Sequence, residues 1–195
     1  MIIIFCTNNY DCFRSTTPIT NPLLIGFDDS NKNKKIEDRS NRRYIASMAD
    51  KDIKELTAQI PAADFEETSF THPVPLDEAT VAIVTSAALH HPGDEDFTML
   101  DVGYRILDAS KHDYLMRHWS PNFDTTGFAL DINTVFPIDR LQELAEQKII
   151  GKVADKHLSY AGNQFDLSSI QLDSGPSGAQ FLKEKGVDVV LLTPV

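Results

Sequence analysis

The strongest hydrophobic pattern lies at the C-terminal end of the sequence. Five of the six residues from 187 to 192 are valine or leucine, which is typical of a strand buried on both faces of a parallel sheet. The preceding segment predicts a helix that begins at Gly175 and Pro176 and ends at Gly186, since glycine after a helix readily adopts the left-handed conformation. A helix, a glycine and a buried strand together form half of a βαβ unit.

A second apolar run, residues 81–85, predicts another buried strand that ends in a loop of small residues. A helix is predicted from Pro137 to Gly151, because apolar residues recur there at helical spacing. Shorter strands are expected at residues 104–107 and 157–160. Open α/β sheets bind ligands just beyond the carboxyl ends of their strands, so the ends of the two buried strands are the first place to look for a site.

This order of elements predicts an α/β fold with a mainly parallel, Rossmann-like sheet and flanking helices. Residues 111–133 are polar with little periodicity, and a loop of that length inside a domain is usually functional. Residues 164–175 are also polar and are expected to form a loop.

The first 47 residues differ from the rest of the chain. Asparagine, aspartate, lysine, arginine and serine dominate residues 28–43 without a helical or strand period, so residues 1–47 are expected to be a disordered extension. Residues 48–195 are expected to form one α/β domain that starts with a helix at 50–60.

Composition narrows the classes of partner. The net charge of −11 argues against nucleic acids and anionic membranes, because their phosphates repel an acidic surface. No apolar run approaches the roughly 18 residues that indicate a membrane span, and residues 1–6 are too few for a secretory signal. The two cysteines, Cys6 and Cys12, form no CxxC motif. A cytoplasmic location is therefore predicted.

The candidate chemistry has no decisive motif. His90 and His91 precede the acidic residues 94–96, and imidazole with carboxylate can bind a divalent metal, but the spacing matches no known metal motif. No metal site is therefore expected. His118 and Asp124 can be read as a base and its orienting carboxylate or as loop hydrogen bonding. Ser86 follows a strand but lies outside a GxSxG motif, so serine hydrolysis has weak support.

Four stretches carry a resemblance in the same order along the chain. They are PLDEATVAIVTSAALH at 75–90, HWSPNFD at 118–124, DINTVFPIDRLQEL at 131–144 and GVDVVLLTPV at 186–195. Together they resemble the selenoprotein B family of glycine, sarcosine, betaine and D-proline reductases, from about residue 75 to the end of the sequence. The third stretch is the most specific of the four.

The resemblance implies a component of a dithiol-linked reductase that cleaves the C–N bond of one of these substrates. In that family a selenol or thiol attacks the carbon that bears nitrogen, and the attacking residue directly follows a motif like that at 191–195. The resemblance therefore predicts that the nucleophile would follow Val195 and that no catalytic nucleophile lies in this chain. The chain would then be the N-terminal part of a subunit, an incomplete domain that is inactive by itself.

The family uses selenocysteine and a pyruvoyl group on a partner subunit, so no cofactor is expected in this chain. The expected partners are a small amino-acid-type substrate and other subunits of the reductase complex. Four residues are expected near the strand ends as binders of the substrate carboxylate or ammonium: His90, His118, Asp124 and Asn133. Two alternatives remain, a non-catalytic ligand-binding or interaction module of the same fold and a metal-dependent hydrolase that uses His90 and His91.

Overall fold

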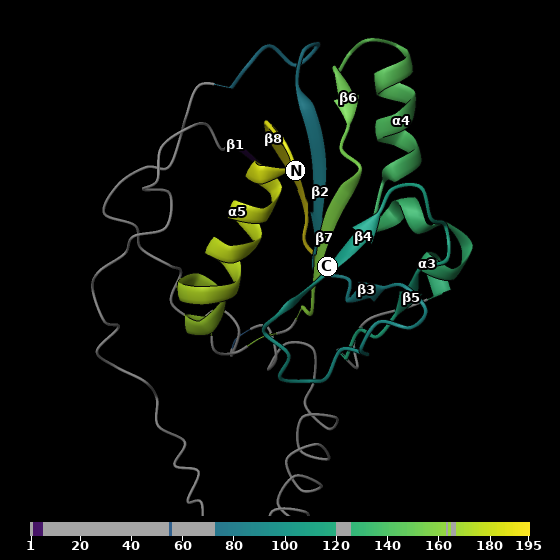
Figure 1. Cartoon of the computed structure of the whole chain (residues 1–195). Coiled ribbons are helices and arrows are strands. Elements are labelled where there is room, and N and C mark those ends of the chain that lie inside the picture. The colour runs from purple at the N-terminus through teal and green to yellow at the C-terminus, as the bar shows by residue number, and fades with distance from the viewer. Residues whose placement is uncertain (1, 6–54, 56–72, 120–125, 163, 165–166) are drawn as a thin grey trace, which may run out of the picture. The chain divides into compact units, whose positions relative to one another are not determined.

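A mixed β-sheet with helices on both faces forms the core of the computed structural model (Figure 1). The structure describes residues 2–5, 55, 73–119, 126–162, 164 and 167–195, and all of these except Glu55 belong to one unit. Its elements are β1 (Ile2–Phe5), β2 (Thr80–Thr85), β3 (Leu89–His90), β4 (Tyr104–Asp108), β5 (Leu115–Met116), α3 (Thr126–Leu130), η1 (Ile132–Thr134), α4 (Ile138–Glu146), β6 (Lys152–Val153), β7 (Lys156–Tyr160), η2 (Ile170–Ser174), α5 (Gly175–Glu184) and β8 (Val189–Thr193).

The main sheet has the strand order β1-β8-β2-β7-β4, and β6 also pairs with β2. Strand β2 runs parallel to β6, β7 and β8. The outer strands are antiparallel, since β1 pairs with β8 and β4 pairs with β7 in that sense. The predicted α/β fold with a mainly parallel sheet and flanking helices is confirmed, with the addition that the edges are antiparallel.

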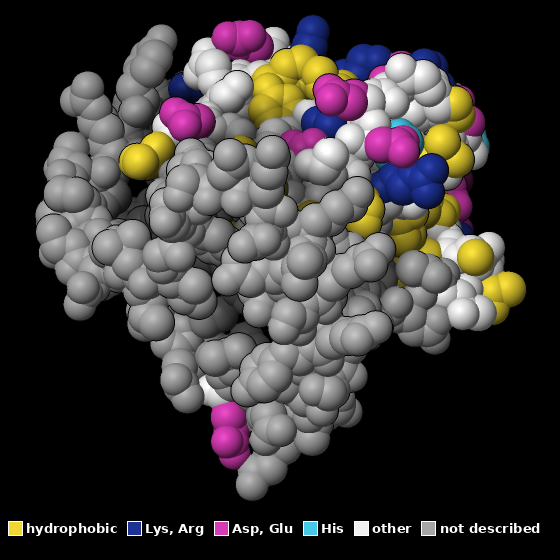
Figure 2. Space-filling model, turned by 90° about the horizontal axis from the view of Figure 1, so that it is seen from below, with side chains coloured by type: hydrophobic (Ala, Val, Ile, Leu, Met, Phe, Trp, Pro, Cys, Tyr) yellow, Lys and Arg dark blue, Asp and Glu magenta, His cyan; other side chains and the backbone are white. Residues whose placement is uncertain are grey.

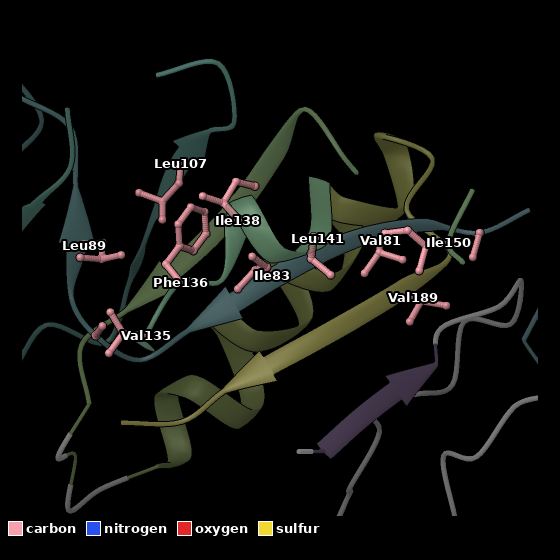
Figure 3. Close-up of a cluster of buried hydrophobic side chains, with 12 residues drawn as sticks. Val81, Ile83, Leu89, Leu107, Val135, Phe136, Ile138, Leu141, Ile150 and Val189 are labelled. Carbon is pink, nitrogen blue, oxygen red and sulfur yellow. The ribbon is translucent and has the colours of Figure 1, made fainter. Parts of the chain in front are cut away.

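Alternation along β2 builds two apolar layers, one on each face of the sheet. Val81 and Ile83 pack with residues of α4, in a cluster that includes Leu141 (Figure 3). Ala82 packs on the other face with Leu182 of α5. Ile83 is fully buried, and burying a side chain of that size contributes roughly 1.5–3 kcal/mol. The continuous apolar run at residues 81–85 correctly predicted a buried strand, because both faces of β2 are covered.

Strand β8 is less buried than its sequence predicts. Of its residues only Val189 is buried, and the others are half-buried. The reason is the placement of the helices, because α5 contacts β7 and α4 contacts β6 more than either covers β8. In the described part of the chain, no helix has the length and apolar character needed to span a membrane.

The two helix ends differ from each other. The predicted end of the last helix is confirmed, since Gly186 has φ of 72° directly after α5. The predicted end of α4 at Gly151 is wrong, because the helix stops at Glu146 and Lys148 takes the left-handed conformation with φ of 58°. Gly151 instead packs so closely on the backbone of Glu78 that a Cβ atom would lie 2.4 Å from its carbonyl carbon.

Two predicted loops contain regular structure. Residues 170–174 form the π-helix η2, in which the Gly175 N–H bonds to the carbonyl of Ile170. Pro176 follows in the first turn of α5, where a proline is tolerated. The polar stretch 111–133 contains β5, α3 and η1. The predicted extension at 1–47, β1 apart, and the helix at 50–60, Glu55 apart, lie outside the described residues.

A buried histidine replaces a backbone acceptor inside the sheet. From Val81 to Val84 strand β2 advances three residues, whereas its partner advances five, from Val153 to Leu158. The two extra residues interrupt the ladder between β6 and β7. The N–H of Ile83 therefore donates to Nδ1 of His157 at 2.8 Å instead of to a carbonyl. Burial lowers the pKa of His157 from 6.5 to about 4, so its ring is neutral at pH 7.

We predict that His157 makes the protein less stable in acid. His157 binds a proton at higher pH in the unfolded chain than in the folded chain. Its contribution to the free energy of unfolding is therefore complete above pH 6.5 and is lost as the pH falls toward 4. The loss is about 3 kcal/mol in total, about half of it between pH 6.5 and 5. Denaturant unfolding at several pH values measures it. A His157→Asn variant, which keeps an acceptor but does not titrate, should lack this slope; equal slopes in both proteins would contradict the prediction.

Candidate functional site

The carboxyl ends of β2 and β8 lie side by side and are joined through Ser86. Thr85 is paired with Thr193, and the Ser86 N–H donates to the Thr193 carbonyl at 3.3 Å. The Ser86 hydroxyl accepts from the Val195 N–H at 2.8 Å and donates to the Val195 carbonyl at 3.3 Å. The Ser86 side chain is therefore committed to the backbone of residue 195, which makes it a structural link and not the activated hydroxyl of a serine hydrolase.

Two threonine hydroxyls bring a third segment to the same place. Thr85 Oγ1 and Thr193 Oγ1 both donate to the carbonyl of Val135, at 2.9 and 2.8 Å. Val135 lies between η1 and α4 and is almost fully buried. Each such bond contributes about 1 kcal/mol, and together they fix the start of α4 against the strand ends.

Gly162 completes this group of residues. Its N–H donates to the Ser86 carbonyl at 2.9 Å. A Cβ atom at this position would lie 2.9 Å from Nε2 of His118, 2.9 Å from the Ser86 oxygen and 3.0 Å from the Val195 oxygen. His118, Ser86, Gly162 and Val195 thus meet where the parallel strands end, and we call these four residues the strand-end cluster.

The imidazole in this cluster is uncharged at neutral pH. Burial lowers the pKa of His118 below its ordinary value of 6.5, and a hydrogen bond with the Val195 backbone offsets part of that shift.

Elsewhere on the described surface of the molecule, acidic and basic side chains lie next to one another (Figure 2). Among the described residues, Arg105 forms an ion pair with Asp101 at 2.7 Å and Arg117 forms one with Asp96 at 3.1 Å.

His90 and His91 are held by protein groups. His90 is 1% exposed, with Nδ1 3.1 Å from the His91 carbonyl and Nε2 3.5 Å from Asp96. His91 bonds to Asp113 through Nδ1 at 2.6 Å, and its Nε2 accepts from the Asp108 N–H at 2.9 Å. Within the described ranges, no three histidine, cysteine, aspartate or glutamate side chains are grouped so as to hold a metal ion.

Asn133 has all its amide groups engaged at the start of α4. Its Nδ2 donates to Asp131 at 2.9 Å and to Asp139 at 2.8 Å, and its Oδ1 accepts from the Asp139 N–H at 3.0 Å. Asp124 lies outside the described residues. Of the four predicted substrate-binding residues, the structure therefore brings His118 into the strand-end cluster. Substrate binding by any of them stays a prediction.

Sequence reasoning missed Gly162 and the threonine pair, and it considered Ser86 only as a nucleophile. A signal was present, because both apolar strands end in hydroxyl residues: Thr85 and Ser86 after the first run, Thr193 after the last. Hydroxyl side chains at neighbouring strand ends can bond to backbone that no longer has a ladder partner. Nothing in the sequence around Gly162 indicates that an imidazole lies against it.

We predict that Gly162→Ala destabilises the protein by about 1–3 kcal/mol, because the added methyl group meets two backbone oxygens that cannot move independently. The matched control is Gly127→Ala in α3, where no atom lies within 4 Å of the added Cβ and alanine favours the helix by up to about 1 kcal/mol. Midpoints of denaturant unfolding measure both. Equal effects of the two substitutions would show that the strand-end cluster is not tightly packed.

Comparison with known proteins gives the affiliation of the chain. The family model described as glycine/sarcosine/betaine reductase selenoprotein B matches residues 27–195. The D-proline reductase subunit gamma of Acetoanaerobium sticklandii is 36% identical over 121 residues, which cover 60% of this chain and 49% of that relative. The chain thus spans about half the length of this curated relative, and no solved structure matches it significantly. It belongs to the glycine/sarcosine/betaine reductase selenoprotein B family.

Proposed function

We propose that this chain is part of a subunit of a dithiol-linked reductase that cleaves the C–N bond of glycine, sarcosine, betaine or D-proline. The observation that carries the proposal is the family match over residues 27–195. The similarity to a D-proline reductase subunit points to the same class of substrate, a small amino acid or its methylated derivative.

We place the substrate at the carboxyl ends of β2 and β8. The helices α4 and α5 lie on opposite faces of the sheet (Figure 1). The chain passes from β2 to β7 by way of α4, and then from β7 back across β2 to β8 by way of α5. Rossmann-like sheets bind ligands at the carboxyl ends of such parallel strands. The strand-end cluster lies there, which supports the assignment of a Rossmann-like domain.

We place the nucleophile directly after Val195 in the full-length subunit. The resemblance assigns the attacking selenol or thiol to that position, and the relative is about twice as long as the part that this chain matches. The surroundings suit such a group, because the atoms closest to a Cβ at Gly162 are an imidazole nitrogen and two backbone oxygens. An imidazole that takes up the proton of a thiol leaves a thiolate beside an imidazolium, and the positive charge of the imidazolium favours the thiolate form.

A selenocysteine, when present, supplies the attacking selenolate, while the strand-end cluster holds the backbone that leads to it. In this proposal the pyruvoyl group belongs to a partner subunit, and the other subunits of the complex are the protein partners. The cytoplasmic location stays a prediction. The alternative of a metal-dependent hydrolase is disfavoured, because hydrogen bonds occupy both ring nitrogens of His91 and a metal ligand needs one of them.

The nucleotide sequence and an activity assay test the proposal together. We expect an in-frame UGA or cysteine codon directly after the codon for Val195, followed by an open reading frame. The reductase complex with the full-length subunit should convert one of the four substrates under anaerobic conditions with dithiothreitol as reductant. Release of the reduced acid and the amine, or of the ring-opened product of D-proline, measures the reaction.

The matched control carries serine in place of the nucleophile and should lose activity by at least about 100-fold, since a hydroxyl is a far weaker nucleophile than a thiolate or selenolate. The 195-residue chain in place of the full-length subunit should be equally inactive. A full-length complex that binds one of the substrates without converting any of them would instead favour the non-catalytic ligand-binding module.

A further inference from the structure

His118 reaches the strand ends from a segment that is anchored on both sides. On one side, the Arg117 N–H donates to the Ala88 carbonyl at 3.0 Å. On the other, the Trp119 indole donates to the Phe97 carbonyl at 3.0 Å. Both bonds tie the segment after β5 to the connection that leaves β2, so the position of the imidazole is fixed by its chain neighbours.

The anchor at Ala88 is itself strained. Ala88 is fully buried and has φ of 54°, a conformation that costs a non-glycine residue roughly 1–2 kcal/mol. Its N–H donates to the Tyr160 carbonyl at 2.9 Å, which holds the turn against the end of β7. Strain that the surrounding structure maintains is characteristic of functional sites. Here it supports the turn that delivers His118 to Gly162.

The state of the ring limits what it can do. Burial lowers the pKa of His118, so the ring is neutral at pH 7, and a neutral imidazole is a poor anchor for a substrate carboxylate. A neutral imidazole is, however, a good proton acceptor, and the protonated ring is a good proton donor. The environment of His118 therefore suits proton transfer better than the substrate binding that its sequence suggests.

We propose that His118 is the proton carrier for the substitution step, an inference that rests on the proposed function. When the nucleophile is a thiol, the imidazole accepts its proton and the sulfur then bonds to the substrate carbon, whereas a selenol has already lost its proton at pH 7. The electron pair of the C–N bond moves to the nitrogen, and the imidazolium returns the proton to that nitrogen. One S–H bond and one C–N bond are replaced by one C–S bond and one N–H bond. No oxidant or reductant is consumed in this step.

A purely structural role makes a different prediction. If His118 only fills the space beside Gly162, then a side chain of similar size and polarity should preserve activity. If His118 carries a proton, then size and polarity are insufficient, and free imidazole should replace a missing ring. The variants His118→Gln and His118→Ala separate these cases, and His112→Gln serves as control because His112 is exposed on the same segment.

The first test uses the full-length subunit with cysteine as nucleophile and needs no substrate. Alkylation of this cysteine by iodoacetamide is followed from pH 5 to 10, because only the thiolate reacts. His118→Gln should slow alkylation at pH 6.5 by about tenfold or more, a shift of about one unit in the thiol pKa, whereas His112→Gln should leave it unchanged. The same alkylation profile in the His118→Gln variant and in the unsubstituted protein would overturn the proposal.

The second test measures turnover by the reductase complex on glycine, sarcosine, betaine and D-proline. His118→Gln should lower kcat by about 100-fold or more, and free imidazole should restore His118→Ala at least about tenfold. Activity within threefold of the unsubstituted complex, or a loss that imidazole does not reverse, would contradict a proton carrier. An unsubstituted complex that turns over none of the four substrates would overturn the proposed function, and the alkylation profile would still decide whether His118 accepts the proton.

Discussion

The parallel pairing of β2 with β8 is the interaction on which the rest of the structure depends. Residues Val81 to Thr85 pair with Val189 to Thr193 in an unbroken register. This register brings two carboxyl ends to one edge of the sheet, and Ser86 extends the contact to Val195 through its hydroxyl. The strand-end cluster exists because these ends coincide, since Gly162 lies against the carbonyl oxygens of both Ser86 and Val195 and His118 lies beside Gly162.

Several polar side chains replace backbone groups inside this sheet. His157 accepts from the Ile83 N–H, Ser159 accepts from the Leu89 N–H at 2.7 Å, and the hydroxyls of Thr85 and Thr193 donate to Val135. Buried backbone groups need partners, so each side chain satisfies a group that an irregular strand or connection leaves without one. Thr85, His157 and Ser159 are polar yet buried, and the bond from Ile83 to His157 explains how the interrupted β6–β7 strand can lie inside the sheet.

The sequence predicts the elements that are defined by their own apolar pattern. It fails where contacts between distant segments decide the end of a helix or the direction of a strand. The apolar runs of β2 and β8 were recognised because both strands have a strand on either side, although the helices cover β8 less completely than β2. The early end of α4 was not, since Lys148 takes the conformation for which Gly151 was the obvious candidate. The antiparallel direction of β4 leaves no mark in its five residues.

The sequence predicted where the candidate site lies, but not which residues form it. Ligand sites lie at the carboxyl ends of parallel strands, and that rule led to the residues around Ser86 and to the end of β8. His118 was among the predicted residues because the resemblance included its segment. Asn133 was included for the same reason, yet its amide holds the start of α4 together. The role of Gly162 depends on a contact between segments more than forty residues apart, at positions 118 and 162, which no local pattern encodes.

Amide hydrogen exchange at Val195 tests the junction of the two strand ends most directly. The Val195 N–H donates to the Ser86 hydroxyl, so this amide should exchange at least about tenfold more slowly than in an unfolded peptide. In Ser86→Ala that protection should disappear, while the buried amide of Ile83 keeps its protection. Exchange of Val195 at the unfolded rate in the unsubstituted protein would show that β2 and β8 are not joined at their ends, and the strand-end cluster would have no basis.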